Sequence, residues 1–124
     1  MLPQPRVLLA EDHAPVARAV SRLLAFDCEV LGTVADGSAV LAAVQRLRPD
    51  VVVLDLNLPN VHGLDACLQI TQALPELRVV VFTAMNDPDV RQRCFDVGAA
   101  AFVHKGGGDV GLLATVKRLC DDRE

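Results

Sequence analysis

Five short apolar runs rich in β-branched residues alternate with longer stretches whose apolar residues recur at helical spacing. The runs cover residues 7–10, 30–34, 51–54, 79–83 and 101–103. Three of them are nearly continuous apolar blocks, which is typical of strands covered on both faces of a parallel sheet. Strands separated by helix-sized segments must be parallel and joined by right-handed crossovers, so this alternation strongly limits the topologies available.

The intervening stretches predict five helices, over residues 14–26, 38–47, 64–74, 88–97 and 109–120. The fourth has the weakest apolar stripe, with only Val90, Cys94 and Val97 to bury. The order predicts an α/β fold, a doubly wound (βα)5 arrangement with a five-stranded parallel sheet and helices on both faces. In such folds the functional crevice lies at the carboxyl ends of the strands.

Length and composition limit the functions that the chain can have. Its 124 residues fit one domain, residues 1–124. A net charge of −4 and the lack of Trp and Tyr argue against direct nucleic-acid binding by this domain. No apolar run approaches the roughly 20 residues of a membrane span, and residues 1–6 do not resemble a signal peptide. We therefore expect a cytoplasmic protein without a membrane association.

The cysteines stand at positions 28, 67, 94 and 120, with no Cys-x-x-Cys pair. Zinc and thioredoxin-type sites need closer spacing. We expect reduced thiols that pack as small hydrophobic side chains.

Polar residues follow four of the five predicted strands. They are Glu11 and Asp12 after the first strand, Asp55 after the third, Thr83 at the end of the fourth and Lys105 after the fifth. Any one of them could be a helix cap or a surface residue. Asp55, however, directly follows the buried run Val51–Leu54, where an unpaired charge is costly. We therefore expect these side chains to meet at one edge of the sheet.

Three carboxylates held close together repel one another unless a cation lies among them. Mg²⁺ suits a site with few carboxylates plus water and a phosphate. Lys105 adds a positive charge and Thr83 a hydroxyl donor, so the group predicts a site that neutralises the oxygens of a transferring phosphoryl group. Gly106 to Gly108 lack the spacing of a nucleotide-binding loop, so another molecule must be the phosphoryl donor.

The order and spacing of four motifs, over residues 7 to about 119, resemble the receiver domains of two-component response regulators, a family of flavodoxin-like topology. The motifs are Leu-Ala-Glu-Asp at 9–12, Leu-Asp-Leu-Asn-Leu-Pro at 54–59 with Gly63, Phe-Thr-Ala at 82–84, and Gly-Ala at 98–99 leading to Phe102 and Lys105.

The resemblance implies that Asp55 accepts a phosphoryl group from a sensor histidine kinase or a phosphotransfer protein. It also implies that Asp12 binds Mg²⁺ directly, that Glu11 assists through water, and that Asp55 and the backbone carbonyl of Asn57 complete the protein ligands. Such a chain is not an enzyme acting on a separate substrate, because it catalyses only its own phosphorylation and dephosphorylation.

Further roles follow from the same resemblance. Lys105 would pair with Asp55 and then with a phosphoryl oxygen, while Thr83 would donate to another oxygen. Phe102 matches an aromatic residue that turns inward as Thr83 moves, although a strand Phe is equally consistent with an ordinary core role. Met85, like Asn57, stands where side chains tune the lifetime of the phosphate, or is an exposed loop residue without that role.

The chain departs from the family pattern at two positions. Gly106 follows the lysine where the family commonly has a proline, so the triple glycine predicts an unusually free loop. His13 replaces a frequent third acid and could titrate near neutrality, although we favour an exposed first-turn residue. His62 and His104 are also expected to be surface residues, since no second histidine stands at metal-ligand spacing.

Several alternatives remain open from the sequence. The chain could be a stand-alone receiver, or one whose output domain, absent from this chain, is a helix-turn-helix DNA-binding domain; it could also form a homodimer on activation. A pseudo-receiver that only binds proteins is disfavoured, since all five site residues are present. A flavodoxin-type electron carrier would need aromatic residues around its flavin, and an aspartyl-phosphate phosphatase would need an acid where Asn57 stands.

Overall fold

The computed structural model describes residues 4–107 and 109–121. The fold is built on five parallel strands, and their order in the sheet is β2-β1-β3-β4-β5. This order confirms the doubly wound (βα)5 prediction, with β3 at the centre of the sheet. The strands are β1 (Arg6–Ala10), β2 (Glu29–Val34), β3 (Val51–Leu54), β4 (Arg78–Thr83) and β5 (Ala101–His104).

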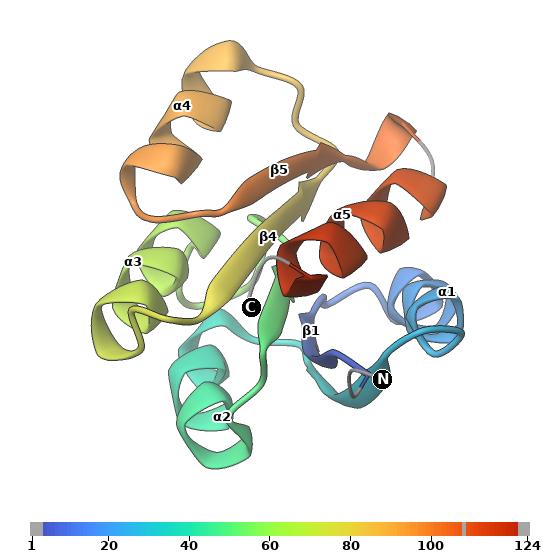
Figure 1. The fold of residues 1–124 in the computed structure, drawn as a ribbon. Coiled ribbons are helices and arrows are strands. Elements are labelled where there is room, and N and C mark those ends of the chain that lie inside the picture. Colours follow the sequence, from blue (N-terminus) through green and yellow to red (C-terminus); the bar gives the residue numbers. More distant parts are fainter. Residues whose placement is uncertain (1–3, 108, 122–124) are drawn as a thin grey trace.

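Helices cover both faces of the sheet, with α1 and α5 on one face and α2, α3 and α4 on the other (Figure 1). Two 3-10 turns, Gly37–Ala39 and Lys105–Gly107, precede α2 and α5. The helices are α1 (Ala14–Leu24), α2 (Val40–Leu47), α3 (Gly63–Ala73), α4 (Pro88–Asp96) and α5 (Asp109–Asp121).

The first helix ends two residues earlier than predicted. The amide of Cys28 donates to the carbonyl of Leu24, which closes a turn directly after the helix. The turn brings Cys28 into the core and leaves Phe26 on the surface, 78% exposed. The apolar character of Phe26 therefore extended the predicted helix beyond its real end.

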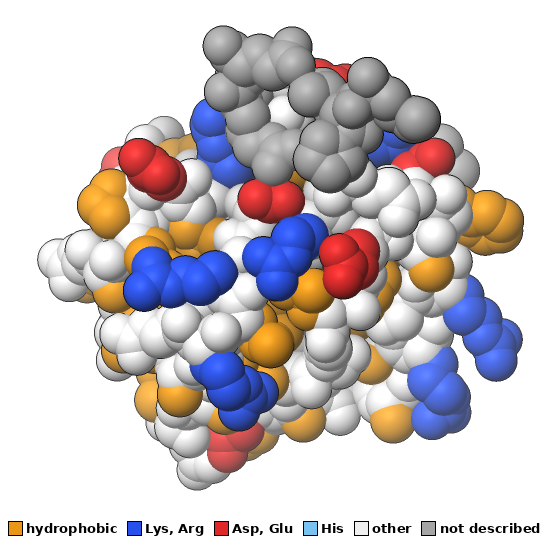
Figure 2. Space-filling view, turned by 60° about the horizontal axis from the view of Figure 1, so that its bottom comes forward, with side chains coloured by type: hydrophobic (Ala, Val, Ile, Leu, Met, Phe, Trp, Pro, Cys, Tyr) orange, Lys and Arg blue, Asp and Glu red, His pale blue; other side chains and the backbone are white. Residues whose placement is uncertain are grey.

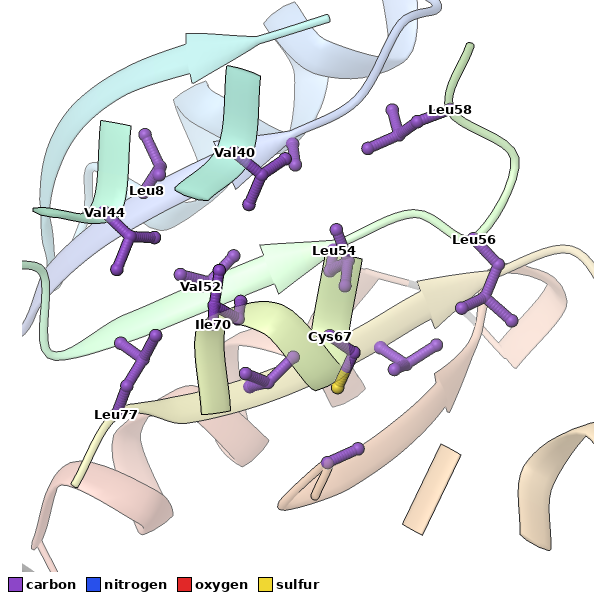
Figure 3. Packing of buried hydrophobic residues seen from close by; sticks show 14 of the residues in the cluster. Leu8, Val40, Val44, Val52, Leu54, Leu56, Leu58, Cys67, Ile70 and Leu77 are labelled. Carbon is purple, nitrogen blue, oxygen red and sulfur yellow. The ribbon is translucent and has the colours of Figure 1, made fainter. Parts of the chain in front are cut away.

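Two apolar clusters fill the space between the sheet and the helices. Val52 and Leu54 face α2 and α3, as Figure 3 shows, whereas Val51 and Val53 face α1 and α5. Successive residues of a strand point to opposite faces, and helices cover both faces here, so all four side chains are fully buried. This double burial explains why the central run of the sequence shows no polar alternation.

Helix α4 has a weak apolar stripe, as predicted: Cys94 is its one buried residue, while Val90 and the following Val97 are partly buried against the same cluster. Its carboxyl end is tied to α3, because the Thr71 hydroxyl donates to the carbonyl of Val97 over 3.0 Å. Gly98 follows with a φ of 103°, close against Thr71, so a side chain at this position would be strained.

All four cysteines are buried thiols, as expected. Burial raises the pKa of Cys28 to about 11 and that of Cys67 to about 12. Within the described ranges, the group suited to a metal ion contains carboxylates and no cysteine. No helix in the described part of the chain has the length and apolar character that a membrane crossing requires.

Candidate functional site

The carboxyl ends of the central strands bring the predicted acids together. Glu11 and Asp12 follow β1 and Asp55 follows β3, and one carboxylate oxygen from each lies within 4.8 Å of the others. Glu11 and Asp55 are buried, with 2% and 6% of their surfaces exposed, while Asp12 is open to solvent. Acids from separate segments therefore form one cluster that solutes can reach from the side of Asp12.

Backbone contacts fix the orientation of Asp55. Its amide donates to the carbonyl of Ala10 over 3.0 Å, which extends the pairing of β3 with β1 by one residue. Its Oδ1 accepts a hydrogen bond from the amide of Asn57 over 3.1 Å. One carboxylate oxygen is thus held by the backbone, and the other, Oδ2, faces Lys105.

The loop after Asp55 is anchored by alternate apolar residues. Leu56 and Leu58 are buried beyond the end of β3, whereas Asn57 between them is exposed (Figure 3). The amide of Gly63 donates to the carbonyl of Leu56, and a Cβ on Gly63 would lie only 2.4 Å from the Cα of Leu56. Gly63 is therefore required for close packing of this loop against the start of α3.

The ammonium group of Lys105 bridges the two buried acids. Its Nζ lies 2.6 Å from Oε1 of Glu11 and 3.2 Å from Oδ2 of Asp55. It also lies 5.6 Å from the centre of the Phe82 ring, which supports the lysine from the core side. The sequence predicted the contact with Asp55, but the shorter contact with Glu11 and the support from Phe82 were not foreseen.

Burial and these contacts shift the pKa values of Glu11 and Lys105. Burial raises the pKa of Glu11, although its hydrogen bond with Lys105 acts in the opposite direction. Burial alone would lower the pKa of Lys105, but its contacts with Glu11 and Asp55 outweigh that effect and raise it. The lysine is therefore charged at neutral pH and holds two carboxylates that would otherwise repel each other.

The donor set fits a hard divalent cation. The cluster offers carboxylate oxygens from three residues, and Mg²⁺ prefers oxygen ligands. Three carboxylates with one ammonium group leave two negative charges uncompensated, which a divalent ion would balance. Asp12 makes no contact with Lys105 among the described ion pairs and is free to bind such an ion.

Two surface hollows differ in their relation to this cluster. One, of about 440 Å³, is bordered by Glu11 and Asp12 and runs along α1 beside the end of β2. The other, of about 970 Å³, lies at the amino ends of the strands, with Arg48 and Arg78 in its lining. The larger hollow contains none of the clustered acids, and the smaller one borders Glu11 and Asp12 but neither Asp55 nor Lys105, so neither hollow encloses the whole site.

Basic and acidic side chains are interspersed on the face of the molecule shown in Figure 2, with small hydrophobic areas between them. That face therefore carries no continuous basic patch among its described residues.

Thr83 and its neighbours complete the edge of the sheet. Thr83 is fully buried at the end of β4, and its Oγ1 accepts a hydrogen bond from the amide of Met85 over 3.2 Å. Phe102 on β5 is half-buried and packs against the cluster that contains Cys94 of α4. The switching role of Phe102 and the tuning role of Met85 stay predictions.

The sequence did not predict one contact of this region. His104 was expected to be an ordinary surface histidine, but its Nε2 lies 3.0 Å from the carbonyl oxygen of Ala84, the residue after Thr83. The pairing of Thr83 with His104 across β4 and β5 creates this contact. The sequence gives both strands but not their register, so it could not reveal the contact.

Comparisons with known proteins agree with this geometry. Residues 7–117 match the response regulator receiver domain family. The chain is 31% identical over 117 residues to the response regulator GacA of Pseudomonas aeruginosa, covering 92% of this chain and 54% of GacA. It is 32% identical over 117 residues to the oxygen regulatory protein NreC of Staphylococcus haemolyticus, again covering 92% of this chain and 54% of the relative.

A solved structure has the same fold. The crystal structure of a LuxR-family two-component response regulator from an Aurantimonas species superposes with a TM-score of 0.92 at 26% identity, covering 98% of this chain and 89% of that one. The chain spans about half the length of the curated relatives that it matches.

Proposed function

Since this chain belongs to the response regulator receiver domain family, we propose that Asp55 accepts a phosphoryl group from a histidine kinase or a phosphotransfer protein. The observation that carries the proposal is the position of its carboxylate. Asp55 lies at the end of the central strand, buried, 3.2 Å from the Lys105 ammonium group and clustered with two other acids.

The reaction needs little from the protein beyond positioning and charge. A carboxylate oxygen of Asp55 attacks the phosphorus of a phosphohistidine, so that an O–P bond forms and the N–P bond breaks. The imidazole of the donor leaves and takes a proton from solvent. Lys105, already within reach of Asp55, would stabilise the negative charge on the phosphoryl oxygens.

We propose Mg²⁺ as the ion that the acidic cluster holds, through Asp12, Asp55 and the backbone carbonyl of Asn57, with Glu11 assisting. When bound, the ion would supply positive charge for the phosphoryl oxygens. The chain would then catalyse only its own phosphorylation and the later hydrolysis of the acyl phosphate.

Phosphorylation would change the edge of the sheet beside α4. The Thr83 hydroxyl, which now accepts from Met85, would instead donate to a phosphoryl oxygen. Phe102 would repack next to α4, whose contact with the core is small, since Cys94 is its one buried residue and Val90 is only partly buried. The new surface would be the signal that a partner recognises.

The output of that signal is proposed from the relatives. The chain spans about half of GacA and of NreC, and the similar solved structure is described as a LuxR-family regulator. We propose that a helix-turn-helix DNA-binding domain acts with this receiver, and that phosphorylation promotes a homodimer. The cytoplasmic location stays a prediction.

Mass spectrometry tests the central proposal. We expect the intact protein to gain the mass of one phosphoryl group when acetyl phosphate and Mg²⁺ are added. Asp55→Asn should abolish the gain, whereas Asp65→Asn, at an exposed acid of α3, should leave it unchanged. Equal labelling of Asp55→Asn, or no labelling of the unmodified chain, would contradict the proposal.

A further inference from the structure

His104 connects the last residue of β5 to the loop that follows β4. It pairs with Thr83 in the sheet, and its ring reaches the carbonyl oxygen of Ala84 over 3.0 Å from Nε2. A carbonyl oxygen can only accept a hydrogen bond, so Nε2 must carry the proton and donate. The neutral tautomer with a proton on Nε2 and the charged imidazolium both satisfy this requirement, so the contact does not depend on the charge of His104.

The small size of Gly106 makes room for this ring. A Cβ at position 106 would lie 2.6 Å from Cε1 and 2.9 Å from Nδ1 of His104. Atoms of this kind essentially never approach so closely, so any side chain at position 106 would displace the imidazole. The departure from the family pattern at Gly106 thus has a structural consequence, since it leaves room for the ring of His104 beside Ala84.

The contact lies at the part of the chain that must move if Thr83 responds to a phosphoryl group. Two hydrogen bonds hold residues 83–85 in the present arrangement: the Met85 amide donates to Thr83 Oγ1, and His104 donates to Ala84. Thr83 is fully buried, so the side chains packed around it restrict any movement of its hydroxyl. A shift of Thr83 toward Asp55 would carry the adjoining peptide of Ala84 with it.

We propose that His104 is a positioning residue that holds the loop after β4 in its unphosphorylated arrangement. The hydrogen bond from His104 to Ala84 breaks when Thr83 moves toward a phosphoryl group on Asp55. Gly106 is the residue that permits the hydrogen bond. This inference rests on the proposed phosphorylation of Asp55, and it adds a residue that sets how readily the domain switches.

The test compares variants in their binding of beryllofluoride, a phosphoryl analogue, in the presence of Mg²⁺. Without the His104 contact, switching costs less, so His104→Ala should bind beryllofluoride about fivefold more tightly, the factor that a typical net hydrogen bond of about 1 kcal/mol gives. Gly106→Ala should have the same effect, because its Cβ displaces the ring. His104→Gln, whose amide can still donate, should restore binding toward that of the unmodified chain.

Two controls separate the contact from general loosening. Adding Gly106→Ala to His104→Ala should change nothing further, because both substitutions remove one interaction. Gly111→Ala in α5, where a Cβ would meet nothing within 4 Å, should leave the affinity unchanged. Unchanged or weaker binding in His104→Ala, or an additive effect in the double variant, would overturn the inference.

A second readout needs no phosphoryl analogue. In the resting protein the amide of Met85 should exchange with solvent about fivefold faster in His104→Ala and Gly106→Ala, by the same hydrogen-bond estimate. If the unmodified chain fails to bind beryllofluoride, the proposed function is wrong, while this exchange still tests the contact. Unchanged exchange at Met85 in both variants would refute the positioning role.

Discussion

Lys105 should stabilise the fold as well as the reaction, and Lys105→Met removes its charge while keeping most of its apolar stem. The lysine is the cation between two buried carboxylates, at 2.6 Å from Glu11 and 3.2 Å from Asp55. Removing one partner of a fully buried pair costs about 3 to 5 kcal/mol. Because the Lys105 side chain is 22% exposed, water screens part of this, and we expect a loss of about 2 kcal/mol in the free energy of unfolding.

The loss should depend on pH in a defined direction. Burial raises the pKa of Glu11 above its ordinary value of 4.5, so the folded chain binds a proton there more readily than the unfolded chain does. Such a group destabilises the fold above its folded pKa, and the destabilisation disappears as the pH falls toward 4.5. Without the lysine, the ionised Glu11 destabilises the fold more strongly. The difference in free energy of unfolding between Lys105→Met and the unmodified chain should therefore become smaller as the pH falls from neutral. Adding Mg²⁺ at neutral pH should also make this difference smaller, because the ion would neutralise the same carboxylates.

Urea unfolding followed by far-ultraviolet circular dichroism is the appropriate assay, since the chain has no Trp or Tyr to give fluorescence. Lys117→Met is the matched control. Its ammonium group lies 3.4 Å from Asp27 in an exposed pair, with side chains 50% and 44% exposed, and exposed pairs contribute about 0 to 1 kcal/mol. Equal losses in the two variants, or a Lys105→Met loss that is independent of pH and of Mg²⁺, would refute the reasoning.

Three further predictions follow from the described contacts. Thr83→Ala should still be phosphorylated but should lose the change in amide exchange over residues 84–105 that phosphorylation induces, whereas Thr83→Ser should keep it; a full change in Thr83→Ala would argue against the switch. Gly63→Ala should lower the free energy of unfolding by about 2 kcal/mol or more, because its Cβ would lie 2.4 Å from the Cα of Leu56; unchanged urea unfolding would contradict this. Iodoacetamide at neutral pH should leave the folded thiols unmodified, because burial raises the pKa of Cys28 to about 11 and that of Cys67 to about 12; rapid alkylation in the absence of urea would show that they are accessible.

The sequence predicted the architecture well because buried positions are apolar, and their spacing along the chain differs between strands and helices. The unbroken run Val51–Leu54 indicated a strand covered on both faces, and the run ends at Asp55, at the carboxyl edge of the sheet. The five strands and five helices of the structure follow the predicted order. The end of the first helix was wrong, since Phe26 suggested burial where a turn exposes it.

The site was less fully predictable, because its details depend on side-chain conformations and on the register of neighbouring strands. Parallel topology is enough to bring Glu11, Asp12 and Asp55 to one edge. It does not determine that Lys105 lies closer to Glu11 than to Asp55, which depends on the path of its side chain across Phe82. The contact of His104 depends on the β4–β5 register, which a single sequence does not show. Gly106 is visible in the sequence, but only the structure shows that it leaves room for the ring of His104.

Locating the modified residue is the most direct test of the account. The chain would be incubated with Mg²⁺ and acetyl phosphate, reduced with borohydride, which converts an acyl phosphate to an alcohol, and digested for peptide mass spectrometry. We expect conversion of Asp55 to homoserine, with Glu11 and Asp12 intact. Reduction at another carboxylate, or none at all when both donor and metal are present, would contradict it.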